Sequence, residues 1–191
     1  MLYSKQLADQ YQLWWATMQI KPQHLLAAQT IASKILTYRD KYQTVEAKTT
    51  VPWPFLAVVH YRESDLNFKY HLHNGDPLTA RTVHVPKGRP VDGHPPFTWE
   101  QSAEDAVRCE GLATLGNWDI PHYLFRLEAY NGWGYRNHGV PSAYLWSFSN
   151  HYDSGKYVGD GEWDPEAVDG QCGVAPILRV LLNQHAFAFP K

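Results

Sequence analysis

The chain has 191 residues and a formal net charge of −2, and its lysines and arginines are scattered rather than clustered. It therefore offers no basic surface for nucleic acid, and no apolar run approaches the roughly 20 residues that a membrane span needs. One hydrophobic core accommodates this length and no linker-like tract divides the sequence, so we expect a single domain over residues 1–191.

Aromatic residues are abundant, with Trp 8, Tyr 12 and Phe 7. Flat rings with a polar edge suit saccharides, because the C–H faces of sugars stack on aromatic rings while their hydroxyls need hydrogen-bond partners. We expect some of these rings to line an open groove. For any one tryptophan, packing in the interior remains the alternative.

Apolar residues at helical spacing predict helices over about residues 2–18 and about 22–38. Residues 53–62 are apolar nearly all round, which is typical of a helix buried in the middle of a domain. Glu63 follows at its C-terminal end, where the sequence becomes abruptly polar.

Residues 64–97 contain three glycines and five prolines around the β-favouring run 81–85, which predicts a small β lobe. Thr98 and Gln101 form a capping-box pattern that predicts a helix to about residue 115. Further helices are expected from Pro121 to about Asn131 and over about 174–184. The predicted fold class is α+β, a mostly helical domain with a small β-hairpin lobe directly after the Glu63 helix.

No metal or cofactor is expected. Five histidines lie within 35 residues, but their spacing lacks a second helical pair, so we interpret them as loop or hydrogen-bonding residues (His60, His71, His73, His84 and His94). Cys109 and Cys172 lack metal-ligand spacing and are predicted to be buried free thiols. The acidic run 160–166 lacks the glycine of a calcium loop and is interpreted as a solvated loop.

The order of a buried helix ending in Glu63, a turn-rich lobe and further helices resembles the lysozyme-like superfamily of phage endolysins, goose-type lysozymes and lytic transglycosylases. The segment 127–135, Leu-Glu-Ala-Tyr-Asn-Gly-Trp-Gly-Tyr, is similar to the Tyr-Asn-Gly segment that lines their sugar groove. Asp76 and Thr82 keep the six-residue step of phage-type lysozymes. The interval from Glu63 to Asp76 is longer than in that family, and the Gly-Leu-Met-Gln motif of typical transglycosylases is replaced by Ser-Asp-Leu-Asn at 64–67.

The resemblance implies a muramidase that cuts the β-1,4 bond between N-acetylmuramic acid and N-acetylglucosamine. Glu63 is then the general acid, with its carboxyl pKa raised by burial, while Asp76 stabilises the sugar cation or activates water that Thr82 holds. The expected substrate-binding residues are His60, Thr79, Tyr130, Asn131, Trp133 and Tyr135.

Several alternatives stay open at this point. Glu63 alone could act as acid and then base, giving the anhydro product of a lytic transglycosylase. Asp76 also fits a conformational role in the turn 74–77, Glu63 fits an exposed helix end, and Tyr130 with Asn131 fits an ordinary helix C-terminus. A non-catalytic saccharide-binding domain and a metal-dependent hydrolase are the rival classes.

The resemblance also supplies the expected partner, the glycan strands of peptidoglycan, bound by a monomer. The N-terminal residues lack the apolar stretch of a signal peptide. We therefore expect synthesis in the cytoplasm and action on the bacterial cell wall, as for a phage or prophage endolysin.

Overall fold

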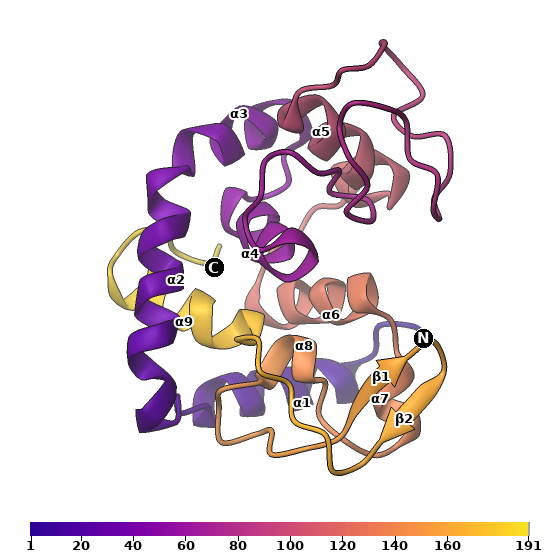
Figure 1. Cartoon of the computed structure of the whole chain (residues 1–191). Helices are drawn as coiled ribbons and strands as arrows, with labels where there is room; N and C mark the ends of the chain where they lie inside the picture. Colours follow the sequence, from indigo (N-terminus) through magenta and orange to yellow (C-terminus); the bar gives the residue numbers. More distant parts are fainter. Residues whose placement is uncertain (191) are drawn as a thin grey trace. The chain divides into compact units, whose positions relative to one another are not determined.

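The computed structural model describes residues 1–190 and is about half helical, with one two-stranded antiparallel sheet among these residues (Figure 1). The α+β class is thus confirmed. The chain packs as two compact units: unit 1 comprises Met1–Ser33 and the chain from Asn117 onward, and unit 2 comprises Lys34–Gly116. The single domain over residues 1–191 stays a prediction, since compactness alone does not show which part folds on its own.

Unit 1 is built on four helices that pack in succession: α1 (Lys5–Thr17) against α6 (Ile120–Asn131), α6 against α8 (Ala143–Trp146), and α8 against α9 (Val174–Asn183) (Figure 1). Side chains cap the two longest of them, because Ser4 accepts the N–H of Leu7 and Asp119 accepts the N–H of His122. The core between these helices contains fully buried aromatic and aliphatic side chains, including Trp146 and Leu124.

Unit 2 contains α3 (Arg39–Thr49), which packs against both α4 (Trp53–Ser64) and α5 (Trp99–Cys109). A short turn of helix, η1 (Pro22–His24), and α2 (Leu25–Thr37) precede them, and the boundary between the units falls within α2. The predicted capping box is confirmed: Thr98 Oγ1 accepts the N–H of Gln101 at 3.2 Å, and the Gln101 side chain accepts the N–H of Thr98 at 2.9 Å.

The helices expected from the sequence are present, with differences at their ends. α5 stops at Cys109 rather than near residue 115, because Gly111 adopts a left-handed conformation (φ 68°) before the short η2 (Leu112–Thr114). The prediction for the cysteines was half correct. Both are free thiols, and Cys172 is buried, but Cys109 is exposed because it lies on the outer face at the end of α5.

The predicted position of the β lobe was wrong. Residues 65–98 contain an isolated bridge between Tyr70 and Pro77 but no strand, and the hairpin is formed instead by β1 (Lys156–Gly159) and β2 (Glu162–Asp164) in unit 1. Prolines donate no N–H to a ladder and glycines with positive φ turn the chain, so the backbone hydrogen bonds of residues 65–98 close separate turns and do not form a ladder. The run 160–166, interpreted as a loop, includes β2.

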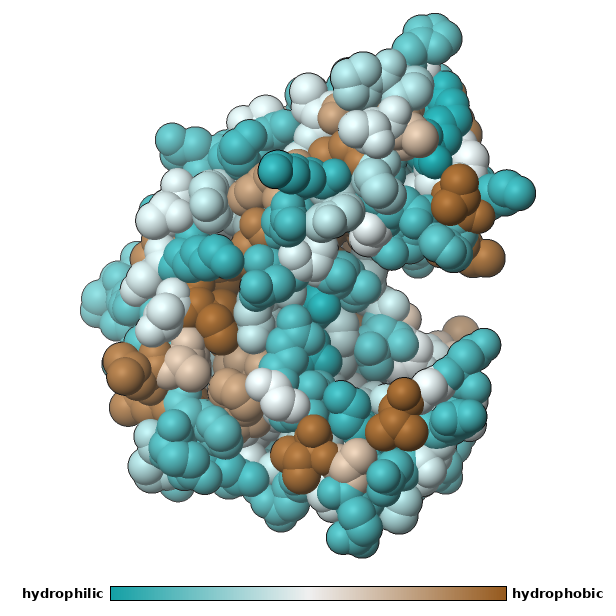
Figure 2. Space-filling model, viewed as in Figure 1, coloured by the Kyte–Doolittle hydropathy of each residue, from teal (hydrophilic) through white to brown (hydrophobic). Residues whose placement is uncertain are grey.

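The surface carries no large apolar patch on the face seen in Figure 2, where brown side chains form small separate groups on a hydrophilic background. The most exposed large apolar side chains are far apart in sequence, as Leu26 is 75% exposed and Val85 is 87% exposed. None of the described helices has the length and apolar character that crossing a bilayer requires.

Candidate functional site

The predicted site residues fall into two groups, one in each unit. Unit 2 contains the three proposed catalytic residues together with His60 and Thr79, and unit 1 contains the Tyr130–Tyr135 segment. Each group is therefore described separately.

Glu63 lies in the last turn of α4 and is half-buried. The first nine residues of the helix, Trp53–Tyr61, are all buried, and the half-buried Arg62 and Glu63 follow them where the sequence becomes polar. The helix closes with two left-handed residues: the N–H of Asp65 donates to the Tyr61 carbonyl at 3.0 Å, and that of Leu66 donates to the His60 carbonyl at 3.4 Å. The chain therefore reverses directly after Glu63.

The segment 71–76 lies beside this end of the helix. A Cβ built on Gly75 (φ 77°) would lie 3.8 Å from the Glu63 carbonyl oxygen. The turn is closed by two backbone bonds, from the N–H of His71 to the Asp76 carbonyl at 2.6 Å and from the N–H of Gly75 to the His71 carbonyl at 3.0 Å. A surface cavity of about 450 Å³ also lies at this end of α4, lined by Lys34, Tyr38 and residues 64–69.

Asp76 is 6% exposed, and its carboxylate accepts hydrogen bonds from the loop that follows. Oδ2 accepts the backbone N–H groups of Val83 at 2.7 Å and His84 at 3.0 Å, while Oδ1 lies 2.6 Å from His84 Nδ1. Burial opposes ionisation, but the hydrogen bonds from His84 and Val83 outweigh it and lower the pKa of Asp76 to about 2. The side chain is thus an ionised anchor for the loop.

The two threonines differ in environment. Thr82 is buried, and its hydroxyl donates to the Pro86 carbonyl at 2.5 Å and accepts the N–H of Arg89 at 2.9 Å. Both hydrogen bonds of the Thr82 hydroxyl therefore stay within the turn 82–89. Thr79 is exposed, which keeps it available to a ligand.

His60 is fully buried in the core of unit 2. Its Nδ1 lies 3.0 Å from the Tyr42 hydroxyl, and its ring packs against Phe68 and Trp99 with centroids 4.6 Å away in each case. Burial lowers the pKa of His60 to about 4, so the ring is neutral near pH 7. It has no exposed surface for a saccharide, and its contacts are those of a core residue that holds α4 to α3 and α5.

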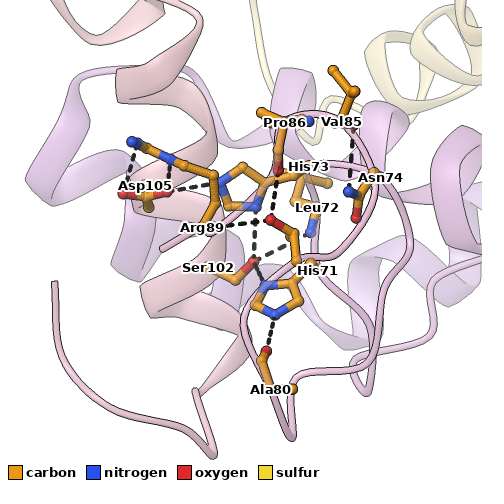
Figure 3. A network of polar contacts seen from close by, with 11 residues as sticks. His71, Leu72, His73, Asn74, Ala80, Val85, Pro86, Arg89, Ser102 and Asp105 are labelled. Atoms are coloured by element: carbon orange, nitrogen blue, oxygen red, sulfur yellow. Dashed lines mark hydrogen bonds and ion pairs between the residues drawn. The ribbon is translucent and has the colours of Figure 1, made fainter. Parts of the chain in front are cut away.

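A polar network lies behind the turn 71–76 and joins it to α5 (Figure 3). Asp105 accepts two hydrogen bonds from Arg89, each 2.8 Å long, and lies 2.8 Å from His73 Nε2. Burial lowers the pKa of His73, although the bond to Asp105 opposes that shift. The carboxylate therefore ties two points of the loop, residues 73 and 89, to one helix.

Ser102 of α5 is the centre of the same network (Figure 3). Its Oγ lies 2.8 Å from His71 Nδ1 and accepts the N–H of Leu72 at 3.3 Å, while His71 Nε2 lies 2.8 Å from the Ala80 carbonyl. A carbonyl only accepts, so Nε2 of His71 carries a proton and donates it to the Ala80 carbonyl. Ser102 is fully buried, so this serine is a structural group and not a nucleophile within reach of a substrate.

Sequence reasoning missed this network. It treated His71 and His73 as loop histidines and singled out neither Ser102 nor Asp105. The alternation of His71 and His73 and the i,i+3 spacing of Ser102 and Asp105 on one helix face were the available signals. Within residues 1–190, no group of three His, Cys, Asp or Glu side chains is arranged to hold a metal ion.

The predicted residues of unit 1 surround the end of α6. The helix ends at Asn131, which is exposed, and Gly132 (φ 92°) closes it, as the alternative of an ordinary C-terminus expects. Tyr130 and Trp133 are half-buried, with the Trp133 ring 5.0 Å from that of Phe125. Asn131, Tyr130 and Trp133 thus retain surface for a ligand.

Tyr135 is only 8% exposed and belongs to an aromatic cluster between α7 (Gly134–Asn137) and the hairpin. Its ring meets those of Tyr157 and Trp163 edge to face, at 5.8 and 5.5 Å. His138 stacks on Trp163 at 3.9 Å with an interplanar angle of 2°, and its Nε2 lies 3.1 Å from the Tyr157 hydroxyl. Tyr135 therefore acts mainly to support the hairpin.

No protein-family model matches the chain, and neither the curated proteins nor the solved structures give a match.

Proposed function

We propose that this chain is a peptidoglycan-cleaving muramidase in which Glu63 protonates the glycosidic oxygen between N-acetylmuramic acid and N-acetylglucosamine. The observation that carries the proposal is the placement of a half-buried carboxylate in the last turn of helix α4, whose residues Trp53–Tyr61 are all buried. The lysozyme-like organisation and substrate are part of the proposal and rest on the resemblance of residues 53–82 and 127–135.

The reaction needs a carboxylic acid because an alkoxide is a poor leaving group. As the C–O bond breaks, the Glu63 proton moves to the departing oxygen and positive charge develops on the muramyl ring. A surface cavity of about 450 Å³ at the same end of α4 has the size of sites that bind small ligands, and Glu63 precedes its lining residues 64–69 in the chain without lining it.

Hydrolysis would continue with water adding its oxygen to C1 while its proton returns to Glu63. Asp76 is a weak base for activating that water. Its carboxylate has a pKa of about 2 and already accepts hydrogen bonds from Val83 and His84, so it has little tendency to take a proton from water. In this proposal its role is to shape the loop, and Thr82 shares that role.

The occupied carboxylate of Asp76 favours a second candidate, a lytic transglycosylase. There the muramyl 6-hydroxyl oxygen attacks C1 and gives its proton to Glu63, which leaves a 1,6-anhydro ring. The resemblance assigns the muramyl acetamido group to Tyr130 and Asn131 in this alternative, and both retain exposed surface within unit 1.

Clearing of a cell-wall suspension tests the proposal. We expect the Glu63→Gln variant to clear walls at least about 100-fold more slowly than the wild type, because the amide has no acidic proton to donate. Glu110→Gln is the matched control, an exposed glutamate in the same unit, and it should clear walls at the wild-type rate. Wall binding without clearing by the wild type would instead indicate a saccharide-binding domain.

The metal-dependent alternative has its own control. Activity that persists in EDTA is expected for a carboxylate mechanism, whereas complete loss in EDTA with recovery on adding Zn²⁺ would contradict the proposed role of Glu63.

A further inference from the structure

A cavity of about 180 Å³ lies within unit 1 and takes no part in the reaction proposed above. It is formed by α1, α6 and α7 and by the short connection after α7. Its lining residues are Gln10, Trp14, Glu128, Arg136, Gly139, Val140 and Pro141.

The floor of this cavity is an ion pair fixed in one geometry. Glu128 is 2% exposed, and Arg136 donates to it from Nε and from Nη2, each at 2.8 Å. The Tyr11 hydroxyl donates to the same carboxylate at 2.5 Å. A paired carboxylate and guanidinium of this kind hold their remaining donors and acceptors in set directions.

Some hydrogen-bonding capacity at the floor is not taken by the described residues. Arg136 has five N–H groups: one on Nε and one on Nη2 serve Glu128, a second on Nη2 donates to the Tyr11 hydroxyl at 3.0 Å, and one on Nη1 donates to the Gln10 side-chain oxygen at 2.9 Å. The second N–H of Nη1 and the amide N–H groups of Gln10 are thus available to a ligand at the cavity.

Charge and size restrict what this cavity can bind. Glu128 would repel an anion and Arg136 would repel a cation, so the cavity favours a neutral dipolar group over either. The walls of Trp14, Val140 and Pro141 are apolar. The volume of about 180 Å³ falls below the 300–1,000 Å³ of sites for whole small ligands, so the cavity suits one substituent of a larger ligand.

We propose that this cavity binds the acetamido group of an N-acetylhexosamine. The carbonyl oxygen accepts from Arg136 and Gln10, the N–H donates to Glu128 Oε1, which accepts only the Nε–H of Arg136 from the described residues, and the methyl group lies against Trp14 and Val140. The choice of a saccharide as the bearer of this group rests on the proposed function, whereas the preference for a neutral acetamide rests on the cavity alone.

The test is binding, observed by NMR on the ¹⁵N-labelled full chain carrying Glu63→Gln so that no bond is cleaved. We expect N-acetylated chitotriose to give saturable shifts of the Trp14 indole N–H and the Gln10 side-chain amide. Deacetylated chitotriose, which carries ammonium groups, should leave both signals unmoved. Signals that do not move with the acetylated sugar would overturn the proposal.

Two further variants locate the site. Val140→Phe fills the cavity and should weaken binding by about tenfold or more, while Val168→Phe, at a side chain that is 62% exposed, should bind as the parent does. Gln10→Leu removes the amide donors with little change in size, and the same loss is expected from it if Val140→Phe does not fold. Unchanged affinity in the folded variant would overturn the proposal.

This inference and the proposed function fail separately. Wall clearing by the wild type with no shifts at Trp14 would overturn the acetamido site and leave the muramidase intact. Shifts of the Trp14 signal with no wall clearing by the wild type would overturn the muramidase and leave the acetamido site intact.

Discussion

Residues 65–98 of unit 2 turn repeatedly, whereas residues 156–164 of unit 1 form one hairpin, and the two regions are held by different contacts. In the first region, separate backbone hydrogen bonds close the turns, and the side chains of Asp76, Ser102 and Asp105 accept or donate the bonds that tie these turns together. The second is held by a backbone ladder and by the pairing of Tyr157 with Trp163 across it. Turn-rich sequence therefore leads either to a polar scaffold or to a hairpin, depending on whether aromatic residues pair across the strands.

The largest expected loss of stability comes from removing Asp105, the carboxylate at the centre of the network that joins residues 65–98 to α5. Asp105→Ala leaves Arg89 and the buried His73 without their partner, and we expect the free energy of unfolding to fall by about 2–3 kcal/mol. Urea denaturation monitors the change. Asp92→Ala, which removes an exposed carboxylate in the same loop, should leave the free energy of unfolding nearly unchanged. Equal losses in the two variants would contradict the role of Asp105 in holding the loop.

The hairpin should respond instead to crowding of its aromatic face. Gly155 has φ 91°, and a Cβ there would lie 2.7 Å from Trp163 Cζ2. We expect Gly155→Ala to lower stability by about 1–3 kcal/mol and to change the near-ultraviolet circular dichroism of the tryptophans. Gly170→Ala is the control, because nothing lies within 4 Å of its Cβ position, and a wild-type spectrum for Gly155→Ala would contradict this packing.

The smallest expected effect is the pH dependence of the stability that Asp76 contributes to residues 65–98. Asp76 has a pKa lowered from 3.8 to about 2, so its contribution to stability is complete above pH about 4 and is lost as the pH falls toward 2. Asp76→Asn should therefore be less stable than the wild type at pH 6, with a difference that shrinks at pH 2.5. A difference that does not depend on pH would show that ionisation of Asp76 is not what anchors the loop.

The sequence predicted the longer helices except α3 (Arg39–Thr49), because their signals are local. The capping box at Thr98 and the apolar run of α4 each indicate a helix from residues that are close together in the sequence. It failed for the hairpin because the pairing of Tyr157 with Trp163 depends on register, and glycines and prolines over 64–97 are as compatible with an irregular loop as with a sheet.

The candidate site was predictable in part. The end of a buried helix indicated Glu63, which lies half-buried in the last turn of α4, and its catalytic role stays a prediction. The surroundings of His60 and the partners of Asp76 were not predictable, because they come from Tyr42 and from the fold of residues 83–84. Contacts between residues distant in sequence decide whether a polar side chain faces a ligand or the core.

Mass analysis of the muropeptides released from purified peptidoglycan tests whether Glu63 is the proton donor. We expect the wild type to release disaccharide-peptides, with reducing muramyl ends if water is the acceptor or with anhydro ends that are lighter by one water, and Glu63→Gln to release almost none. Release of the same products at the same rate by Glu63→Gln, or intact glycan strands after incubation with the wild type, would contradict it.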